Sequence, residues 1–135
     1  MIAKARALER SYGPEPAIDL RAVIAGVLVV FMLTVLAAAL LAVGIYVTDM
    51  TEAHVAGILY YIGLLAIACG GAVASRKAGT RGWLHGALTG ILYGVLSLAL
   101  GALLFPGVEA LAGAAVKLAA AAAAGLLGGI VGINL

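Results

Sequence analysis

The feature that most constrains this chain is a series of four apolar segments, each long enough to cross a lipid bilayer. A transmembrane helix needs about 20 consecutive, mainly apolar residues. Backbone polar groups in lipid must be paired within their own segment, so each segment is expected to be a helix. The four predicted spans are interrupted only by short turns and cover about residues 22–47, 54–75, 83–105 and 108–133.

The composition agrees with a membrane environment. Of the 135 residues, 65% are hydrophobic and 10% are charged, whereas about a quarter of the residues of a soluble domain are charged. So few charges cannot form a surface that water solvates, which excludes a soluble enzyme and makes the lipid bilayer the expected surrounding. Most of the 19 glycines lie inside the apolar segments, as they do in transmembrane helices.

The chain divides into a polar N-terminal segment and one membrane domain. Residues 1–20 are the polar segment, expected in the cytoplasm, and residues 21–135 are the domain of four transmembrane helices. The first apolar run is too long for a signal peptide, whose apolar part has about 7–15 residues. We therefore expect this run to be retained as the first span.

The turns and their charges predict the topology. Short turns allow little besides antiparallel neighbours, so we expect an all-α, up-down-up-down bundle of four transmembrane helices. The turns on one side contain Asp49, Glu52 and Glu109 and no lysine or arginine. Because positive charges mark the cytoplasmic side, both termini are expected there. The seven basic residues on that side are Lys4, Arg6, Arg10, Arg21, Arg76, Lys77 and Arg81.

Small residues recur at four-residue spacing in the third and fourth segments. Close backbone approach over small residues drives the association of helices in lipid, where apolar surface alone gives no attraction. We therefore predict a glycine zipper, with a leucine row on the third segment (Leu84, Leu88, Leu92 and Leu96) facing lipid. The predicted helix-packing residues are Gly82, Gly86, Gly90, Gly94, Gly125, Gly128, Gly129 and Gly132.

Lys117 is the one ionisable residue well inside an apolar segment. In a helix that begins near residue 108, it would lie about 13 Å below the outer edge at 1.5 Å per residue. Such a charge is costly and often marks a functional site, here an anion path. Alternatively, its side chain leans outward toward Glu109 and Glu52, and a later helix start would place it at the interface. Both interpretations stay open.

A row of polar side chains lies beside the glycine row of the third segment. His85, Thr89, Tyr93 and Ser97 repeat every four residues and form, with Lys117, the candidate intramembrane polar residues. Hydrogen bonding between helices is the first interpretation of this row, and a pathway is the second. The only other histidine, His54, is predicted on the opposite side of the membrane, so the two do not indicate a metal site.

The basic turn between the second and third segments indicates contact with lipid headgroups. Arg76, Lys77 and Arg81 would attract anionic lipid, at about 1 kcal/mol per charge near the surface. The same charges also serve the topology, and the two roles are compatible. Nucleic acid is not an expected partner, because these basic residues lie next to the membrane and no soluble domain accompanies them.

No pattern in the sequence indicates catalysis. There is no embedded pair of carboxylates, no serine or cysteine with a histidine in reach, and no phosphate-binding loop between a strand and a helix. We therefore expect a protein that is not an enzyme and has no cofactor and no metal site.

Two stretches of sequence resemble a known family. The run Gly-Gly-Ala-Val-Ala-Ser-Arg-Lys-Ala-Gly-Thr-Arg-Gly-Trp-Leu-His-Gly at residues 70–86, continuing to Gly90 and Tyr93, and the ending at residues 127–134 resemble the YrzE-like family. Its members are small four-span membrane proteins of Gram-positive, often spore-forming, bacteria, and their function is unknown. The resemblance implies a multi-pass protein of the bacterial cytoplasmic membrane and no catalytic residues.

Two functional hypotheses follow. The first is a non-enzymatic structural or accessory module that packs through glycine-rich helix faces and associates with itself or with a larger membrane complex. The second is a small homo-oligomeric channel or transporter, with the polar row and Lys117 lining its path. The absence of an embedded aspartate or glutamate argues against proton- or cation-coupled exchange, so the sequence favours the first hypothesis.

Overall fold

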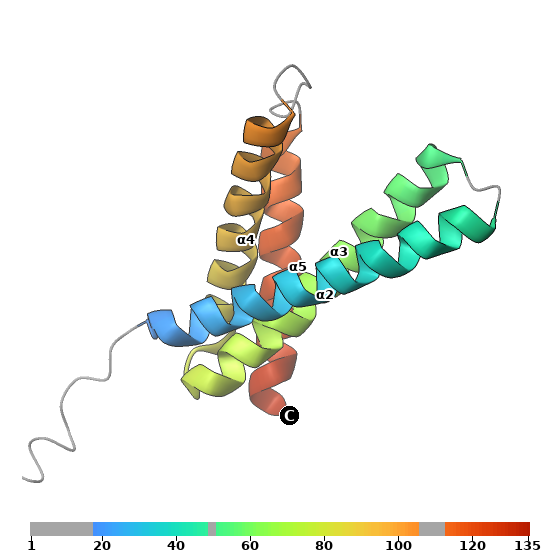
Figure 1. The fold of residues 1–135 in the computed structure, drawn as a ribbon. Coiled ribbons are helices and arrows are strands. Elements are labelled where there is room, and N and C mark those ends of the chain that lie inside the picture. Colours follow the sequence, from blue (N-terminus) through green and yellow to red (C-terminus); the bar gives the residue numbers. More distant parts are fainter. Residues whose placement is uncertain (1–17, 49–50, 106–112) are drawn as a thin grey trace, which may run out of the picture.

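The computed structural model describes residues 18–48, 51–105 and 113–135. These ranges contain four helices and no strand, and each helix is long and apolar enough to cross a membrane (Figure 1). The expectation of four helices that are long and apolar enough to span a membrane is therefore confirmed. The helices are α2 (Leu20–Val47), α3 (Glu52–Ala78), α4 (Gly82–Leu104) and α5 (Ala114–Asn134).

Local signals set the helix ends. The Asp19 carboxylate accepts hydrogen bonds from the backbone N–H groups of Arg21 and Ala22, which caps α2. Gly79 ends α3 in the left-handed conformation, with φ of 69°. Gly113 has φ of 78° immediately before α5, which therefore begins at residue 114 rather than near 108 as the hydropathy predicted. Most of the polar segment 1–20, and the turn with Pro106 and Glu109, lie outside the described residues.

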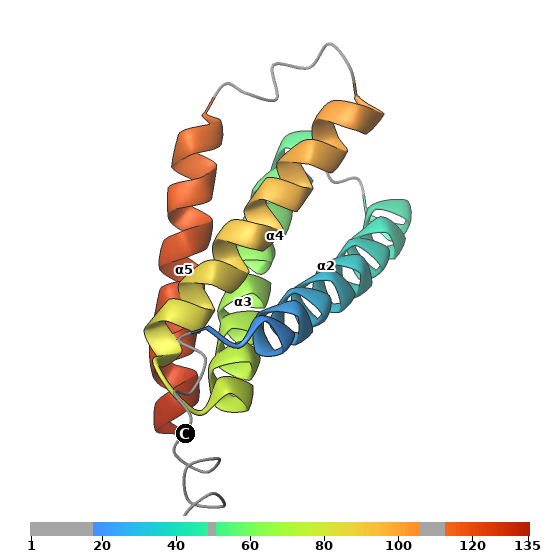
Figure 2. The same ribbon diagram turned by 90° about the vertical axis from the view of Figure 1, so that its left-hand side faces the viewer.

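The helices form two pairs that cross at one end and diverge at the other (Figures 1 and 2). Helix α2 packs beside α3, and α4 packs beside α5. All buried residues of the described chain lie in four stretches at the crossing, which we call the closed half: 22–30, 66–75, 82–90 and 121–132. The remaining turns of the four helices form the open half, where most side chains are exposed.

Glycine backbones meet directly in the closed half. A Cβ built on Gly26 of α2 would lie 2.6 Å from the Gly70 carbonyl oxygen of α3, closer than the 3.0 Å that Cβ atoms keep. The Gly125 carbonyl of α5 occupies the space that a side chain would need at Gly71 of α3 and at Gly86 of α4. A single turn of α5 therefore holds both neighbouring helices at backbone distance.

The predicted helix-packing glycines fall into two groups. Seven of them would bring an added Cβ against the backbone of another helix: Gly82, Gly86, Gly90, Gly125, Gly128, Gly129 and Gly132. Gly94 differs, because a Cβ there would meet only the side chains of Leu118 and Ala121. The close contact of the glycine row thus ends at Gly90, where the helix pairs begin to separate.

The exposed face of α4 differs from the predicted leucine face. Three of the four leucines, Leu84, Leu88 and Leu92, are half-buried, and Leu96 is 39% exposed. Trp83 and Ile91 of the neighbouring row are 53% and 42% exposed. The cause is α2, which contacts α4 beside the polar row: the Thr89 methyl group lies against Gly26. The leucine row is adjacent to that polar row and is partly covered with it.

The glycine contacts generate a matched test within α4. We expect Gly90→Leu to lower the free energy of unfolding by about 3 kcal/mol, because the new side chain would collide with the Ala121 backbone. Gly101→Leu is the control, since nothing lies within 4 Å of a Cβ at that position. Unfolding in detergent, followed by circular dichroism, measures both. Equal losses would contradict the packing described above.

Candidate functional site

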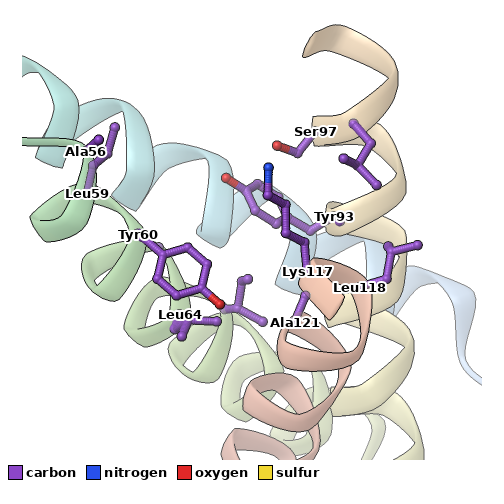
Figure 3. A pocket seen from close by; sticks show the side chains of 13 residues that line it. Ala56, Leu59, Tyr60, Leu64, Tyr93, Ser97, Lys117, Leu118 and Ala121 are labelled. Carbon is purple, nitrogen blue, oxygen red and sulfur yellow. The ribbon is translucent and has the colours of Figure 1, made fainter. Parts of the chain in front are cut away.

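A cavity in the described chain lies where the helix pairs separate. It has a volume of about 370 Å³ and is lined by α3, α4 and α5 (Figure 3). Its inner end is formed by Ile67 and Ala121, which belong to the buried core and are each 4% exposed. The cavity is therefore closed at the end that faces the closed half, and it lies in the open half.

Lys117 is the charged residue of this cavity. It lies in the first turn of α5, about 4.5 Å of helix rise beyond Ala114. This position replaces the deep location inferred from an earlier helix start and puts the lysine close to the helix end. Figure 3 shows its side chain extending from α5 to the level of Ser97, toward the helix N-terminus. This is the direction expected of a lysine that reaches toward an interface.

Three hydroxyl groups from two other helices line the same cavity. Tyr93 and Ser97 come from α4, and Tyr60 comes from α3 (Figure 3). The Tyr93 ring is fixed by an edge-to-face contact with Phe31 of α2, with centroids 5.1 Å apart and planes at 69°. The cavity therefore combines one cation and three hydroxyls with an otherwise apolar lining.

The structure divides the predicted polar row into two parts. Tyr93 and Ser97 line the cavity, whereas His85 and Thr89 are buried in the closed half. The Thr89 hydroxyl donates to the His85 carbonyl of its own helix at 2.8 Å. The row is therefore not a continuous polar path along α4.

His85 connects the starts of α2 and α4. Its Nε2 atom accepts a hydrogen bond of 3.0 Å from the backbone N–H of Asp19, and its Nδ1 atom lies 3.1 Å from the Arg81 carbonyl. Because Nε2 is an acceptor, we assign the proton of the neutral ring to Nδ1, which donates to Arg81. His85 is 1% exposed, and both of its nitrogens are paired. It is thus a structural contact between two helices.

The basic turn lies at the closed end of the molecule, away from the cavity. Arg76 and Lys77 are exposed in the last turn of α3, where positive charge also favours the helix dipole. Arg81 is exposed and adopts a left-handed backbone, with φ of 45°. This cluster and Lys117 are therefore separate cationic regions.

The sequence did not predict two features of the structure, the position of Tyr60 on the cavity and the Asp19–His85 hydrogen bond. Tyr60 was missed because its position on the cavity depends on how far α3 diverges from α4, which local sequence does not encode. The Asp19–His85 hydrogen bond was missed because its donor is a backbone group and has no sequence signal. No group of three metal-ligand side chains occurs among the described residues.

Comparison with known proteins gives one match. A family model described as a protein of unknown function, DUF3792, matches residues 19–132. This stretch includes all four helices except the last two residues of α5. No curated protein and no solved structure matches the chain.

The His85 contact predicts an asymmetry between the two histidines. His85→Leu leaves the part-buried Asp19 N–H without its acceptor, and we expect a loss of about 1–3 kcal/mol in unfolding free energy. His54 is exposed near the start of α3, so His54→Leu should change stability by less than about 0.5 kcal/mol. Chemical denaturation in detergent compares the two variants. A His85→Leu protein as stable as the wild type would refute the assigned contact.

Proposed function

We propose that this chain, which belongs to the DUF3792 family of proteins of unknown function, is a non-enzymatic membrane module. The observation that carries the proposal is the division into a closed half held by glycine backbones and an open half with a blind cavity. The closed half leaves no polar path through the chain, and it gives the module a rigid base. The open half would then contact the partner, which is either a second copy or a larger membrane complex. The glycine faces are not free for this contact, because they pack against one another within the chain.

An up-down-up-down order of the spans fits the contacts between helices. Gly82, Gly86 and Gly90 of α4 meet progressively earlier residues of α5, from Gly129 to Ala121, as antiparallel neighbours do. Helices α3 and α5 run parallel to each other, since Ala68 lies against Gly128 and Ala72 against Gly132. An up-down-up-down order requires the second and fourth spans to run parallel, as α3 and α5 do. The pattern in α4 and α5 is the proposed glycine zipper.

A bacterial cytoplasmic membrane with both termini inside is the proposed setting. Four of the five described basic residues lie at the closed end: Arg21, Arg76, Lys77 and Arg81. Glu52 and the fifth, Lys117, lie near the helix starts at the other end. This charge asymmetry supports the orientation. The resemblance to YrzE-like proteins supports the bacterial membrane.

A channel or transporter is the alternative proposal, and the cavity is the observation that favours it. Lys117, Tyr93 and Ser97 line one space, as an anion path would require. The closed inner end at Ile67 and Ala121 argues against a path within one chain, so conduction would need several copies or a rearrangement of the helices. The module is therefore our first proposal.

The proposed orientation predicts the location of the C-terminus. A fluorescent protein fused after Leu135 should fluoresce in bacterial cells, and alkaline phosphatase fused at the same point should be inactive, because the phosphatase folds only outside the cytoplasm. Fusions after Val47 should give the opposite pair of results. Active phosphatase after Leu135 would reverse the proposed orientation.

The blind cavity predicts that the protein conducts no small anion. Liposomes with the purified chain should show no flux of chloride, nitrate or phosphate above that of empty liposomes. Flux by the wild type that is lost in Lys117→Met but kept in Lys77→Met would contradict the module. That result would establish the alternative, because Lys77 lies outside the cavity.

A further inference from the structure

We propose that the cavity between α3, α4 and α5 binds one anionic phospholipid, with its phosphate at Lys117 and an acyl chain along the apolar lining. The inference rests on the membrane placement proposed above and assigns a ligand to the open half. It concerns a site distinct from the basic turn, which lies at the other end of the molecule.

The depth of Lys117 suits a lipid phosphate. The lysine lies in the first turn of α5, next to the end of the helix, and its side chain extends toward that end (Figure 3). A helix end of a span lies near the membrane interface, where phosphate groups are located. A long lysine side chain at that level places its ammonium group among headgroups rather than in hydrocarbon.

The polar groups of the cavity complement a phosphodiester. An ammonium group and the hydroxyls of Ser97 and Tyr93 supply charge and hydrogen-bond donors to phosphate oxygens. Among the described residues that line the cavity, Lys117 is the only charged one, and none is a carboxylate. An anion is thus the complementary ligand.

The rest of the cavity suits an acyl chain. The rest of the lining includes Leu59, Leu64, Ile67 and Leu118, which have purely hydrocarbon side chains. Its volume of about 370 Å³ is at the lower end of ligand pockets, which is enough for part of one lipid and not for several. A soluble anion would fill only the polar end and leave this apolar surface without a partner.

A second, wholly apolar groove provides a comparison for the cavity at Lys117. It lies between α2 and α3, has a volume of about 290 Å³, and is lined only by hydrophobic residues, such as Leu36, Leu40 and Ile62. That groove can contact any acyl chain but cannot distinguish headgroups. Of these two spaces, the cavity at Lys117 alone joins apolar walls to a cation, so selectivity for anionic lipid is expected there.

The experiment measures lipid binding to the purified full-length chain in a gentle detergent by native mass spectrometry. The probes are phosphatidylglycerol, which is anionic, phosphatidylcholine, which is zwitterionic, and inorganic phosphate. We expect one phosphatidylglycerol to bind more tightly than phosphatidylcholine. Lys117→Gln should weaken phosphatidylglycerol binding about fivefold, the effect of one charge near a membrane surface, and leave phosphatidylcholine binding unchanged.

Two matched controls separate the cavity from general charge and from general packing. Lys77→Gln removes the same charge at the basic turn and should leave the tight phosphatidylglycerol site intact. Gly63→Leu places a side chain in the cavity, and it should weaken both lipids, because nothing lies within 4 Å of a Cβ at Gly63 to prevent folding. Gly57→Leu, also on α3 and in open space but outside the cavity, should bind as the wild type does.

Three results would overturn the proposal: equal weakening by Lys117→Gln and Lys77→Gln, equal weakening by Gly63→Leu and Gly57→Leu, or displacement of phosphatidylglycerol by inorganic phosphate at similar concentration. The last would assign the site to a soluble anion. Failure here leaves the module and its orientation standing, because binding in detergent is independent of topology. Reversed topology would instead move the site to the cytoplasmic leaflet without abolishing binding.

Discussion

Contact between glycine backbones determines how these helices are arranged. Lipid solvates leucine as well as another helix does, so association depends on close van der Waals contact and polar bonds between helices. Gly125 illustrates this dependence, since its carbonyl lies against Gly71 of α3 and Gly86 of α4 together. With α2 held by Gly26 against Gly70, one small region joins all four helices. A buried polar contact also stabilises this region, because His85 of α4 accepts a hydrogen bond from the backbone at the start of α2.

The open half follows from where the small residues stop. Beyond Gly90 on α4 the next glycine of the row, Gly94, faces the Leu118 side chain, and larger residues hold the backbones apart. The separation produces a cavity that is apolar at its core end and polar at Lys117. The same residues therefore explain both the rigid base and the ligand site proposed in the open half.

The sequence predicted the helices well and the spaces between them poorly. Hydropathy placed four spans, because length and apolar composition are local properties. It placed the start of the fourth too early, since Gly113 breaks the helix through a left-handed backbone that hydropathy does not register. Helical periodicity predicted that the leucine row faces lipid but could not show that α2 covers its side of α4. The cavity and the Asp19–His85 bond depend on how separate helices meet, and no local pattern encodes them.

The central claim, that backbone contact at glycine holds the closed half, is tested most directly by a glycine-to-alanine scan. Alanine adds only the Cβ and is the better helix former by about 1 kcal/mol. We predict a change of sign. Alanine at Gly86, Gly125 or Gly128 lowers the free energy of unfolding, because a Cβ there meets backbone. Alanine at Gly44, Gly57 or Gly101, where nothing lies within 4 Å of a Cβ, raises it. Stabilisation at both sets of positions would show that the helices do not pack through these backbones.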